Sequence, residues 1–358
     1  MGVFVALLII PLLIQHVTMG EVYINFKRRN YIAILFFFIF LTFLIMFRHE
    51  SVGNDTANYI YFFNKLSIID WASVVKYPLE IGYSCYNKLI SLFIQNSQVF
   101  LCVTAILTSV MIYPTYKRLC IDPTLTITLF CTMSTFVMLF SGIRQMLAIG
   151  LGFVAYEFTR NKKLLPFLII VALAITFHLS AFMLFFMYPL YHIKITKNHL
   201  MVLVPILITI FVFNKQIFSV LSFIIERYTN YDTTITKTNS YTMIILFALF
   251  VIFAFLVPEE QNIDKETRGL RNFLIFALAL QMFAPLHTVA MRMNYYYIVF
   301  IPLLMPKIIS LRSERWKQVA VVGRHTMIVF FMLYFFFNAK YGGGNLHVFP
   351  YHFFWENI

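Results

Sequence analysis

Charge is scarce in this sequence. Only 12% of its 358 residues are charged, whereas 61% are hydrophobic and 42 are phenylalanines. A soluble core of this length could not hide so much apolar surface from water, which excludes a soluble globular protein. The apolar residues form continuous runs that do not alternate with polar ones, so the sequence predicts membrane-spanning helices. The predicted fold class is all-α, a polytopic integral membrane helical bundle.

Cysteines and clusters of acidic residues are also few. The four cysteines lack the spacing of metal ligands and lie mostly in apolar context: Cys85, Cys102, Cys120 and Cys131. We therefore predict no disulfide, and no aspartate cluster suggests a divalent metal or another cofactor. Basic residues exceed acidic ones, giving a formal charge of +13, but they stand in short clusters between apolar runs. That placement indicates membrane topology and not nucleic-acid binding.

About twelve spans can be drawn, several of them shorter than the roughly 20 residues that a helix needs to cross a bilayer. They cover residues 2–19, 31–47, 98–116, 124–141, 145–159, 164–177, 179–191, 199–213, 241–257, 272–290, 294–310 and 319–337. The first is predicted as a retained span, since it lacks the basic leader and cleavage site of a signal peptide. The stretch 81–95 is predicted as an interfacial or re-entrant helix.

With these spans, most basic residues fall on one face, which the positive-inside rule makes cytoplasmic. Their clusters lie at 27–29, 117–118, 160–163, 194–197, 265–271 and 307–317. Both chain ends are then predicted outside, and three outer segments are long enough to fold. They are the loop 48–97, expected to contain short helices, the loop 214–240, rich in hydroxyls and aromatic residues, and the tail 338–358. Loops too long for mere connection are usually functional, so we expect a polar cavity on the outer face. The whole chain, 1–358, is predicted as one integral domain.

Four cationic or titratable side chains stand at the outer ends of predicted spans: Arg48, Arg144, His178 and Arg292. A charge near a helix centre costs about 2.5–3.5 kcal/mol on insertion scales, so persistent ones often line a cavity. Each of these side chains also has a possible structural role. An arginine can snorkel to lipid headgroups, a histidine in a tight turn is often structural, and Arg292 precedes tyrosines of the interfacial kind. Their convergence on one face favours binding of a ligand with concentrated negative charge, such as a lipid-linked diphosphate.

The stretch "RHESVGNDTANYIYFF" adds carboxylates and amides beside this face. Gly53, Asn54 and Asp55 predict a turn, followed by a short helix that carries Tyr59. Asp55, and Glu80 further along, could hydrogen-bond sugar hydroxyls or deprotonate one. The alternative is a solvated loop that caps a helix. For residues 214–240 the alternatives are a lid and an ordinary connecting loop.

Several of these motifs resemble those of one family in the same order along the chain. "RHESVGNDTANYIYFF" resembles the signature after the second helix of EpsG-like and Wzy-type exopolysaccharide polymerases, with Asn54 where that signature usually has Thr. "SGIRQMLAIGLGFVAYEF", "FHLSAFMLFFMYPL" and "RMNYYYIVFIPLLMPKI" are similar to later segments of the family. The resemblance covers residues from about 31 to 310.

The resemblance implies an enzyme of the bacterial cytoplasmic (inner) membrane whose active face points outward. It would polymerise undecaprenyl-diphosphate-linked oligosaccharide repeat units for capsule, O-antigen or exopolysaccharide. The expected catalytic residues are Arg144, Arg292, His178, Asp55 and Glu80, with no ranking of the last three as the base. The expected substrate-binding residues are Arg48, Gly53, Asn54, Tyr59, Gln145 and Tyr296.

The expected partners are the lipid-linked oligosaccharide and membrane lipid, with a chain-length regulator and a flippase as further candidates. Two alternative functions stay open. A flippase for the same lipid-linked sugars would be expected to show paired halves and broken helices at the bilayer midplane. An O-antigen ligase or a membrane acyltransferase would face outward as well, and the ligase would differ mainly in its acceptor.

Overall fold

The computed structural model describes residues 2–17, 26–224, 240–286, 288–341 and 346–357. Within these ranges all regular elements are helices, which confirms the predicted all-α class. The apolar composition of the helices is that of an integral membrane protein. The chain divides into two compact units, Met1–Phe185 with Arg324–Ile358 and Phe186–Gly323. The prediction of a single integral domain stays a prediction.

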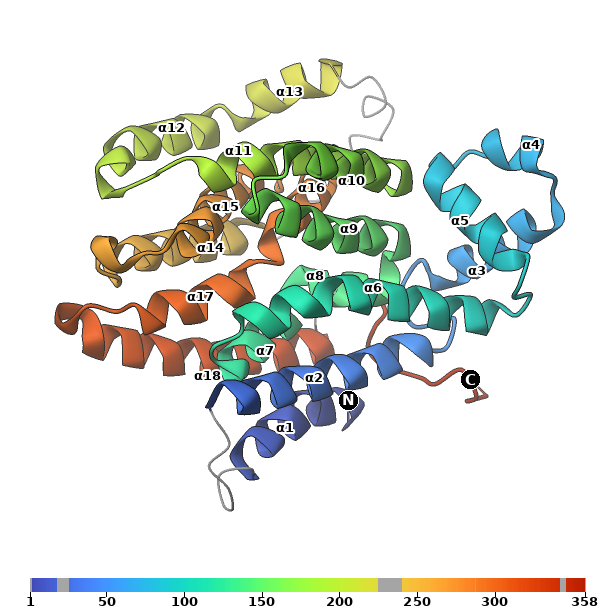
Figure 1. The fold of residues 1–358 in the computed structure, drawn as a ribbon, viewed down its shortest axis with the longest axis horizontal. Helices are drawn as coiled ribbons and strands as arrows, with labels where there is room; N and C mark the ends of the chain where they lie inside the picture. The colour runs from blue at the N-terminus through green and yellow to red at the C-terminus, as the bar shows by residue number, and fades with distance from the viewer. Residues whose placement is uncertain (1, 18–25, 225–239, 287, 342–345, 358) are drawn as a thin grey trace. The chain divides into compact units, whose positions relative to one another are not determined.

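The first unit holds the helices of the N-terminal half and most of the last helix. They are α1 Gly2–Val17, α2 Phe26–Met46, α3 Thr56–Ile68, α4 Trp71–Val75, α5 Ile81–Ser91, α6 Ser97–Leu119, α7 Pro123–Thr132, α8 Ser134–Ser141, α9 Ile143–Arg160, α10 Leu164–Phe177, the 3₁₀ helix η1 Leu179–Phe186 and α18 Lys317–Tyr341. The predicted loop 48–97 contains the short helices α3, α4 and α5. Helix α3 lies beside the start of α6, and α5 packs against α3 and α4 (Figure 1).

The second unit holds the remaining helices. They are α11 Met187–His192, η2 Lys197–His199, α12 Leu200–Val212, α13 Asn214–Ile224, α14 Ser240–Leu256, η4 Glu260–Asn262, α15 Lys265–Gln281, α16 Thr288–Ile298, α17 Ile301–Ser310 and η5 Glu314–Trp316. The predicted loop 214–240 therefore begins as a helix, and its residues 225–239, with Glu226, Arg227 and Asp232, lie outside the described residues.

Within the described ranges, fewer helices are long and apolar enough to cross a bilayer than the twelve spans that the sequence predicted. Among the described residues, Ser97–Leu119 and Glu314–Tyr341 are each long and apolar enough to cross a bilayer. Two bent pairs would raise the count to four, Pro123–Thr132 with Ser134–Ser141 at 62° and Lys197–Val212 with Asn214–Val220 at 77°. Other apolar helices are shorter, so the predicted count of twelve is not confirmed.

Breaks inside the predicted spans explain part of this difference. The predicted span 294–310 is divided at residues 299–300, where Pro302 lies in the first turn of α17. Proline lacks a backbone N–H, so it suits a helix start and not a helix interior. Arg292 lies within α16, which runs from Thr288 to Ile298, and not between the predicted spans 272–290 and 294–310.

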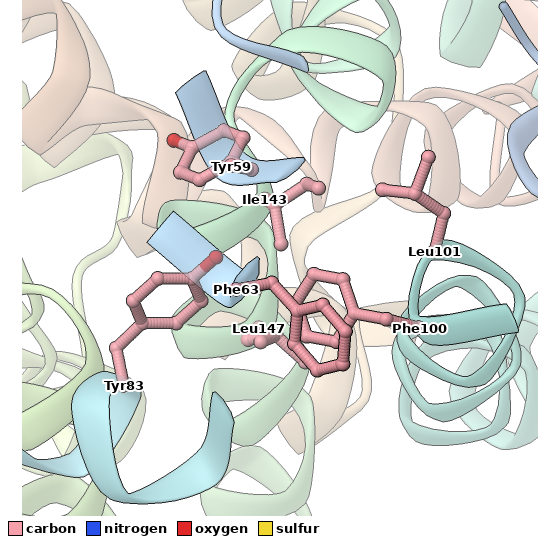
Figure 2. Close-up of a cluster of buried hydrophobic side chains, with 7 residues drawn as sticks. All are labelled: Tyr59, Phe63, Tyr83, Phe100, Leu101, Ile143 and Leu147. Atoms are coloured by element: carbon pink, nitrogen blue, oxygen red, sulfur yellow. The ribbon is translucent and has the colours of Figure 1, made fainter. Parts of the chain in front are cut away.

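An aromatic core joins α3, α5, α6 and α9 in the first unit. Phe63 and Phe100 stack with ring centroids 4.3 Å apart, and Ile143 and Leu147 of α9 pack beside them (Figure 2). These side chains are 4% exposed or less, and burial of large apolar groups is the main force that holds such helices together. This core fixes the first turn of α9, where Arg144 lies.

Candidate functional site

Arg144 lies in the first turn of α9, directly after the break at Gly142 that ends α8. Its Nη1 atom lies 2.5 Å from Oε2 of Glu80, and the two side chains are 26% and 15% exposed. A cation at a helix N-terminus is opposed by the helix dipole, so the carboxylate of Glu80 offsets an unfavourable position. The structure therefore brings together two of the predicted catalytic residues that are 64 positions apart in sequence.

Glu80 precedes α5 and also reaches the turn after α10. Burial raises the pKa of its carboxyl group, but the charge of Arg144, backbone hydrogen bonds including that of Leu179, and His178 outweigh this effect. The pKa of Glu80 therefore lies below its ordinary value of 4.5. At neutral pH Glu80 is an ionised acceptor, which links the start of α9 to the turn at residues 178–180.

His178 caps the C-terminal end of α10, where the sequence predicted a turn. Its Nδ1 atom lies 2.7 Å from the hydroxyl of Ser180 and accepts a hydrogen bond from the backbone N–H of Ser180 at 3.3 Å. Because a backbone N–H can only donate, these hydrogen bonds assign the proton of the neutral ring to Nε2. His178 is thus arranged as a hydrogen-bond donor at Nε2.

A close approach of α5 to the end of α10 allows this arrangement. A Cβ atom added at Gly82 would lie 2.1 Å from Oγ1 of Thr176 and 2.9 Å from its carbonyl carbon. A residue with a side chain at position 82 would therefore push the two helices apart. Glycine at this position keeps Glu80 within reach of the 178–180 turn.

Two tyrosines form the aromatic wall beside the ion pair. The guanidinium carbon of Arg144 lies 5.9 Å from the ring centroid of Tyr83, and the rings of Tyr83 and Tyr59 meet edge to face at 5.9 Å. Figure 2 shows both tyrosines at one side of the aromatic core. Tyr59 also interacts electrostatically with Arg144. The predicted residue Tyr59 therefore belongs to the same cluster, whereas Tyr83 was missed because its helix carries no recognisable motif.

Arg48 is placed differently from Arg144, since it is only 1% exposed. Its Nη1 atom donates to the carbonyl of Ile45 at 2.5 Å and its Nε atom donates to Thr56 at 3.3 Å. Burial lowers the pKa of Arg48 to about 10, so the side chain stays charged at neutral pH. A cation that binds the last carbonyls of a helix is stabilised by the helix dipole. Arg48 thus acts as a C-terminal cap of α2 in this structure.

A small cavity adjoins Arg48 and is lined also by residues of α6, α8 and α9, among them Thr104, Thr108 and Met146. It has room for about one water molecule. A sugar diphosphate does not fit this space. The expected polar cavity on the outer face therefore stays a prediction.

The predicted turn after Arg48 is present and tightly held. Gly53 has φ of +89°, and a Cβ atom there would lie 2.3 Å from the carbonyl oxygen of Phe140. Asn54 is exposed, whereas Asp55 is half-buried and precedes α3 without a side-chain capping bond. In the described part of the chain, the Asp55 carboxylate has no hydrogen bond or ion pair. Glycine is therefore required for the turn, and Asp55 keeps an uncommitted carboxylate.

The other predicted residues lie on helices, Gln145 on α9 of the first unit and Arg292 and Tyr296 on α16 of the second. Gln145 follows Arg144 but is 2% exposed. Arg292 is exposed on α16 of the second unit, and Tyr296, one turn later, is 1% exposed. Among the described residues, no three His, Cys, Asp or Glu side chains are close enough together to hold a metal ion.

The segment after α18, residues 346–357, lies in the tail 338–358, which the sequence predicted as an outer segment but without a partner. Its backbone pairs with the turn after α2, as Gly53 donates to the carbonyl of His347 at 3.1 Å and Asn54 to that of Leu346 at 3.0 Å. The aromatic run "FPYHFFW" was a signal that the segment packs against something, but nothing in the sequence indicated its partner.

Comparison with known proteins adds to this geometry. The model of the EpsG family matches residues 31–353, which is most of the chain. The chain belongs to the EpsG family. No curated protein and no solved structure shows a significant match.

Membership of the EpsG family indicates a polymerase of polysaccharide biosynthesis and an integral membrane protein. The matched range of the EpsG family includes the Glu80–Arg144 pair, the turn at His178 and Arg292. It also extends past α18 into the C-terminal segment. The family match therefore covers the residues that the sequence singled out and most of the C-terminal segment.

Proposed function

We propose that this EpsG-family protein polymerises undecaprenyl-diphosphate-linked oligosaccharide repeat units at the outer face of the bacterial cytoplasmic membrane. The observation that carries the proposal is the half-buried Arg144–Glu80 pair at a break between helices, next to His178 and two tyrosines. A partly exposed guanidinium with a fixed direction is suited to a phosphate group. Family membership supplies the class of reaction.

The proposed reaction is a glycosyl transfer. A hydroxyl oxygen of one repeat unit attacks the anomeric carbon of the glycan carried by a second lipid diphosphate. The bond between that carbon and the phosphate oxygen breaks, and the lipid diphosphate leaves with the bonding electrons. The hydroxyl proton passes to a base of the protein. No oxidant, reductant or further reactant is needed.

Arg144 has the role of holding the diphosphate and stabilising the negative charge that grows on it as the bond breaks. The first backbone N–H groups of α9 and the positive end of its helix dipole both lie at the start of this helix. Both favour an anion there. Preorganised donors of this kind often supply the largest share of catalysis. Glu80 then serves to orient Arg144 and is displaced only in part when the phosphate binds.

Asp55 is the best placed candidate for the base. The carboxylate of Glu80 is already bound to Arg144, and the hydrogen bonds of His178 leave its Nε2 atom protonated. Asp55 lies one helical turn before Tyr59, which interacts with Arg144, and has an uncommitted carboxylate among the described residues. We assign proton acceptance to Asp55 and hydrogen-bond donation to His178.

The remaining residues receive narrower roles. Arg48 and Gly53 shape the loop, while the exposed side chain of Asn54 is offered to a sugar hydroxyl. Arg292 is a separate candidate for contact with phosphate. Polymer formation by Arg292→Ala alone tests this role. A chain-length regulator and a flippase remain proposed partners.

Reconstitution tests this function. The purified protein is placed in lipid vesicles with lipid-linked repeat units extracted from the source strain, and the products are separated by size on a gel. A ladder of polymer is the expected result. Transfer of one unit to another acceptor would indicate a ligase, and movement across the bilayer without a new covalent bond would indicate a transporter.

An Asp55→Asn variant sharpens the mechanism in the same assay. It should bind the lipid-linked unit as the unchanged protein does but form polymer at least about 100-fold more slowly. Full activity in that variant at normal protein level would remove Asp55 as the base. His178→Asn, which keeps a donor but cannot titrate, should retain most of the rate.

A further inference from the structure

The C-terminal segment, residues 346–357, folds back onto the loop that follows α2. We call this segment the clasp. Its backbone pairs with the loop in an antiparallel bridge between Arg48 and Phe353. The N–H of His49 donates to the carbonyl of His352 at 2.8 Å, in addition to the bonds that Gly53 and Asn54 donate to the clasp. The clasp thus holds the loop at both of its ends.

The clasp also completes the end of α2. The last carbonyls of a helix have no partner within it, and inside a membrane protein they need one from elsewhere. Here each receives a donor from outside the helix: Leu44 from the Tyr351 hydroxyl, Ile45 from Arg48, Met46 from Gln98 and Phe47 from the backbone of Phe354. Two of the four donors belong to the clasp.

The conformation of the clasp is strained where it meets the turn. Leu346 and His347 have φ of +51° and +55°, in the left-handed region that side chains disfavour. Their carbonyls are the acceptors for Asn54 and Gly53. Strained backbone persists only where its surroundings hold it, and it is common next to functional sites. Burial of Val348 and Tyr351, which are 0% and 8% exposed, supplies the anchor.

We propose that the clasp is a positioning element of the polymerase site, which keeps the loop 47–56 in the shape that presents Asn54 to the sugar. This inference rests on the proposed function, but the contacts that carry it do not involve Arg144. The loop meets the clasp on one side and Phe140 on the other, through the hydroxyl of Thr56 at 3.1 Å. The clasp therefore acts through the loop and touches no reacting atom.

Two variants test the role at different strengths. A chain that stops after residue 345 should stay in the membrane but need at least a 10-fold higher concentration of lipid-linked unit for half-maximal rate. Tyr351→Phe, which removes only the hydroxyl bond to α2, should raise KM a few-fold and leave kcat unchanged. Tyr341→Phe, at an exposed position in the last turn of α18, is the matched control and should change neither. Loss of kcat at unchanged KM in the first two would show a merely structural role and overturn the proposal.

A disulfide lock separates a fixed clasp from a lid that must open. His49→Cys with His352→Cys places two cysteines at facing positions of the antiparallel bridge, in a background without the four natural cysteines. The oxidised protein should keep the activity of the reduced form within about 2-fold. Inactivation on oxidation that a reductant reverses would mean that the segment has to leave, contrary to the proposal.

Amide hydrogen exchange gives a readout that does not depend on activity. The amides of His49, Gly53 and Asn54 should exchange slowly in the full chain and much faster in the chain that stops after residue 345. Equal exchange in the two chains would contradict the clasp. If the unchanged protein forms no polymer ladder, the proposed function fails, while hydrogen exchange still decides whether the clasp orders the loop.

Discussion

Two arginine–glutamate pairs stand at the opposite ends of α9. At its start, Arg144 lies 2.5 Å from Glu80, and near its end Glu157 lies 2.6 Å from Arg118. Each pair contains one member that the helix dipole disfavours, a cation in the first turn and an anion close to the last. The partner from another element offsets that energy in both cases. By distance alone the two pairs are nearly equal.

Their surroundings are different. Glu157 is bound also by Arg160 at 3.3 Å and lies beside Thr115, and the side chains of Arg118 and Glu157 are 30% and 34% exposed. A pair that is about one-third exposed and screened by water contributes only about 0–1 kcal/mol to stability. The first pair is more buried and faces a histidine and two tyrosines. The comparison teaches that neighbouring groups, and not the ion pair itself, mark the candidate site.

The largest expected difference between the pairs concerns polymer formation. Arg144→Ala should lower the rate by about 100-fold or more, because it removes a fixed cation next to the developing phosphate charge. Lipid-linked single units should then accumulate in cells. Arg118→Ala is the matched control and should polymerise normally. The measurement is polymer length and amount on a gel at equal protein levels, and normal polymer with Arg144→Ala would end its assigned role.

A second difference is expected from the glycines that let helices approach. Gly82→Ala, beside the Arg144–Glu80 pair, should lower the free energy of unfolding of the protein by about 1–3 kcal/mol. The new methyl group would clash with Thr176, including its backbone. Gly150→Ala in α9 is the control, since its nearest neighbour is the flexible end of Met111 at 2.6 Å. Thermal unfolding in detergent measures both. A larger loss at Gly150 than at Gly82 would contradict the close approach of α5 to α10.

The smallest expected difference concerns pH. The pKa of Glu80 is lower in the folded protein than its ordinary value of 4.5, so its contribution to stability is fully present above that value. It is lost as the pH falls through the folded pKa. The protein should therefore have a higher Tm than Glu80→Gln at pH 7, and the gap should shrink below about pH 4.5. A gap that widens in acid would show that the pKa shift has the opposite sign. Glu157→Gln, in the more exposed of the two pairs, should change Tm little at pH 7.

Much of the local structure around the site was predictable from sequence. The turn at Gly53, the short helix with Tyr59 and the turn at His178 all form where their residue types favour them. Glycine and polar residues define such turns through local backbone preferences, which sequence reports directly. Helix breaks within apolar runs were harder, since uniform hydrophobicity conceals where a span ends. The break between α16 and α17, inside the predicted span 294–310, is an example.

The role of Arg48 could not be read in the same way. Its position after an apolar span is shared with arginines that bind phosphate and with those that cap a helix. Only the structure shows that its guanidinium is turned back onto α2 and covered by residues far along the chain. Arg144 has a similar local sequence setting, yet its guanidinium remains partly exposed.

The sequence by itself determined that this protein lies in a membrane, that its fold is helical, and which residue types stand at the ends of its helices. Composition decides these, because a chain so rich in apolar residues must bury them in lipid and satisfy its backbone within helices. The tertiary structure alone decided which of those residues meet. Glu80 and Arg144, or Gly53 and His347, are brought together by packing between distant segments. Such contacts depend on the sum of many weak interactions, which no local pattern records.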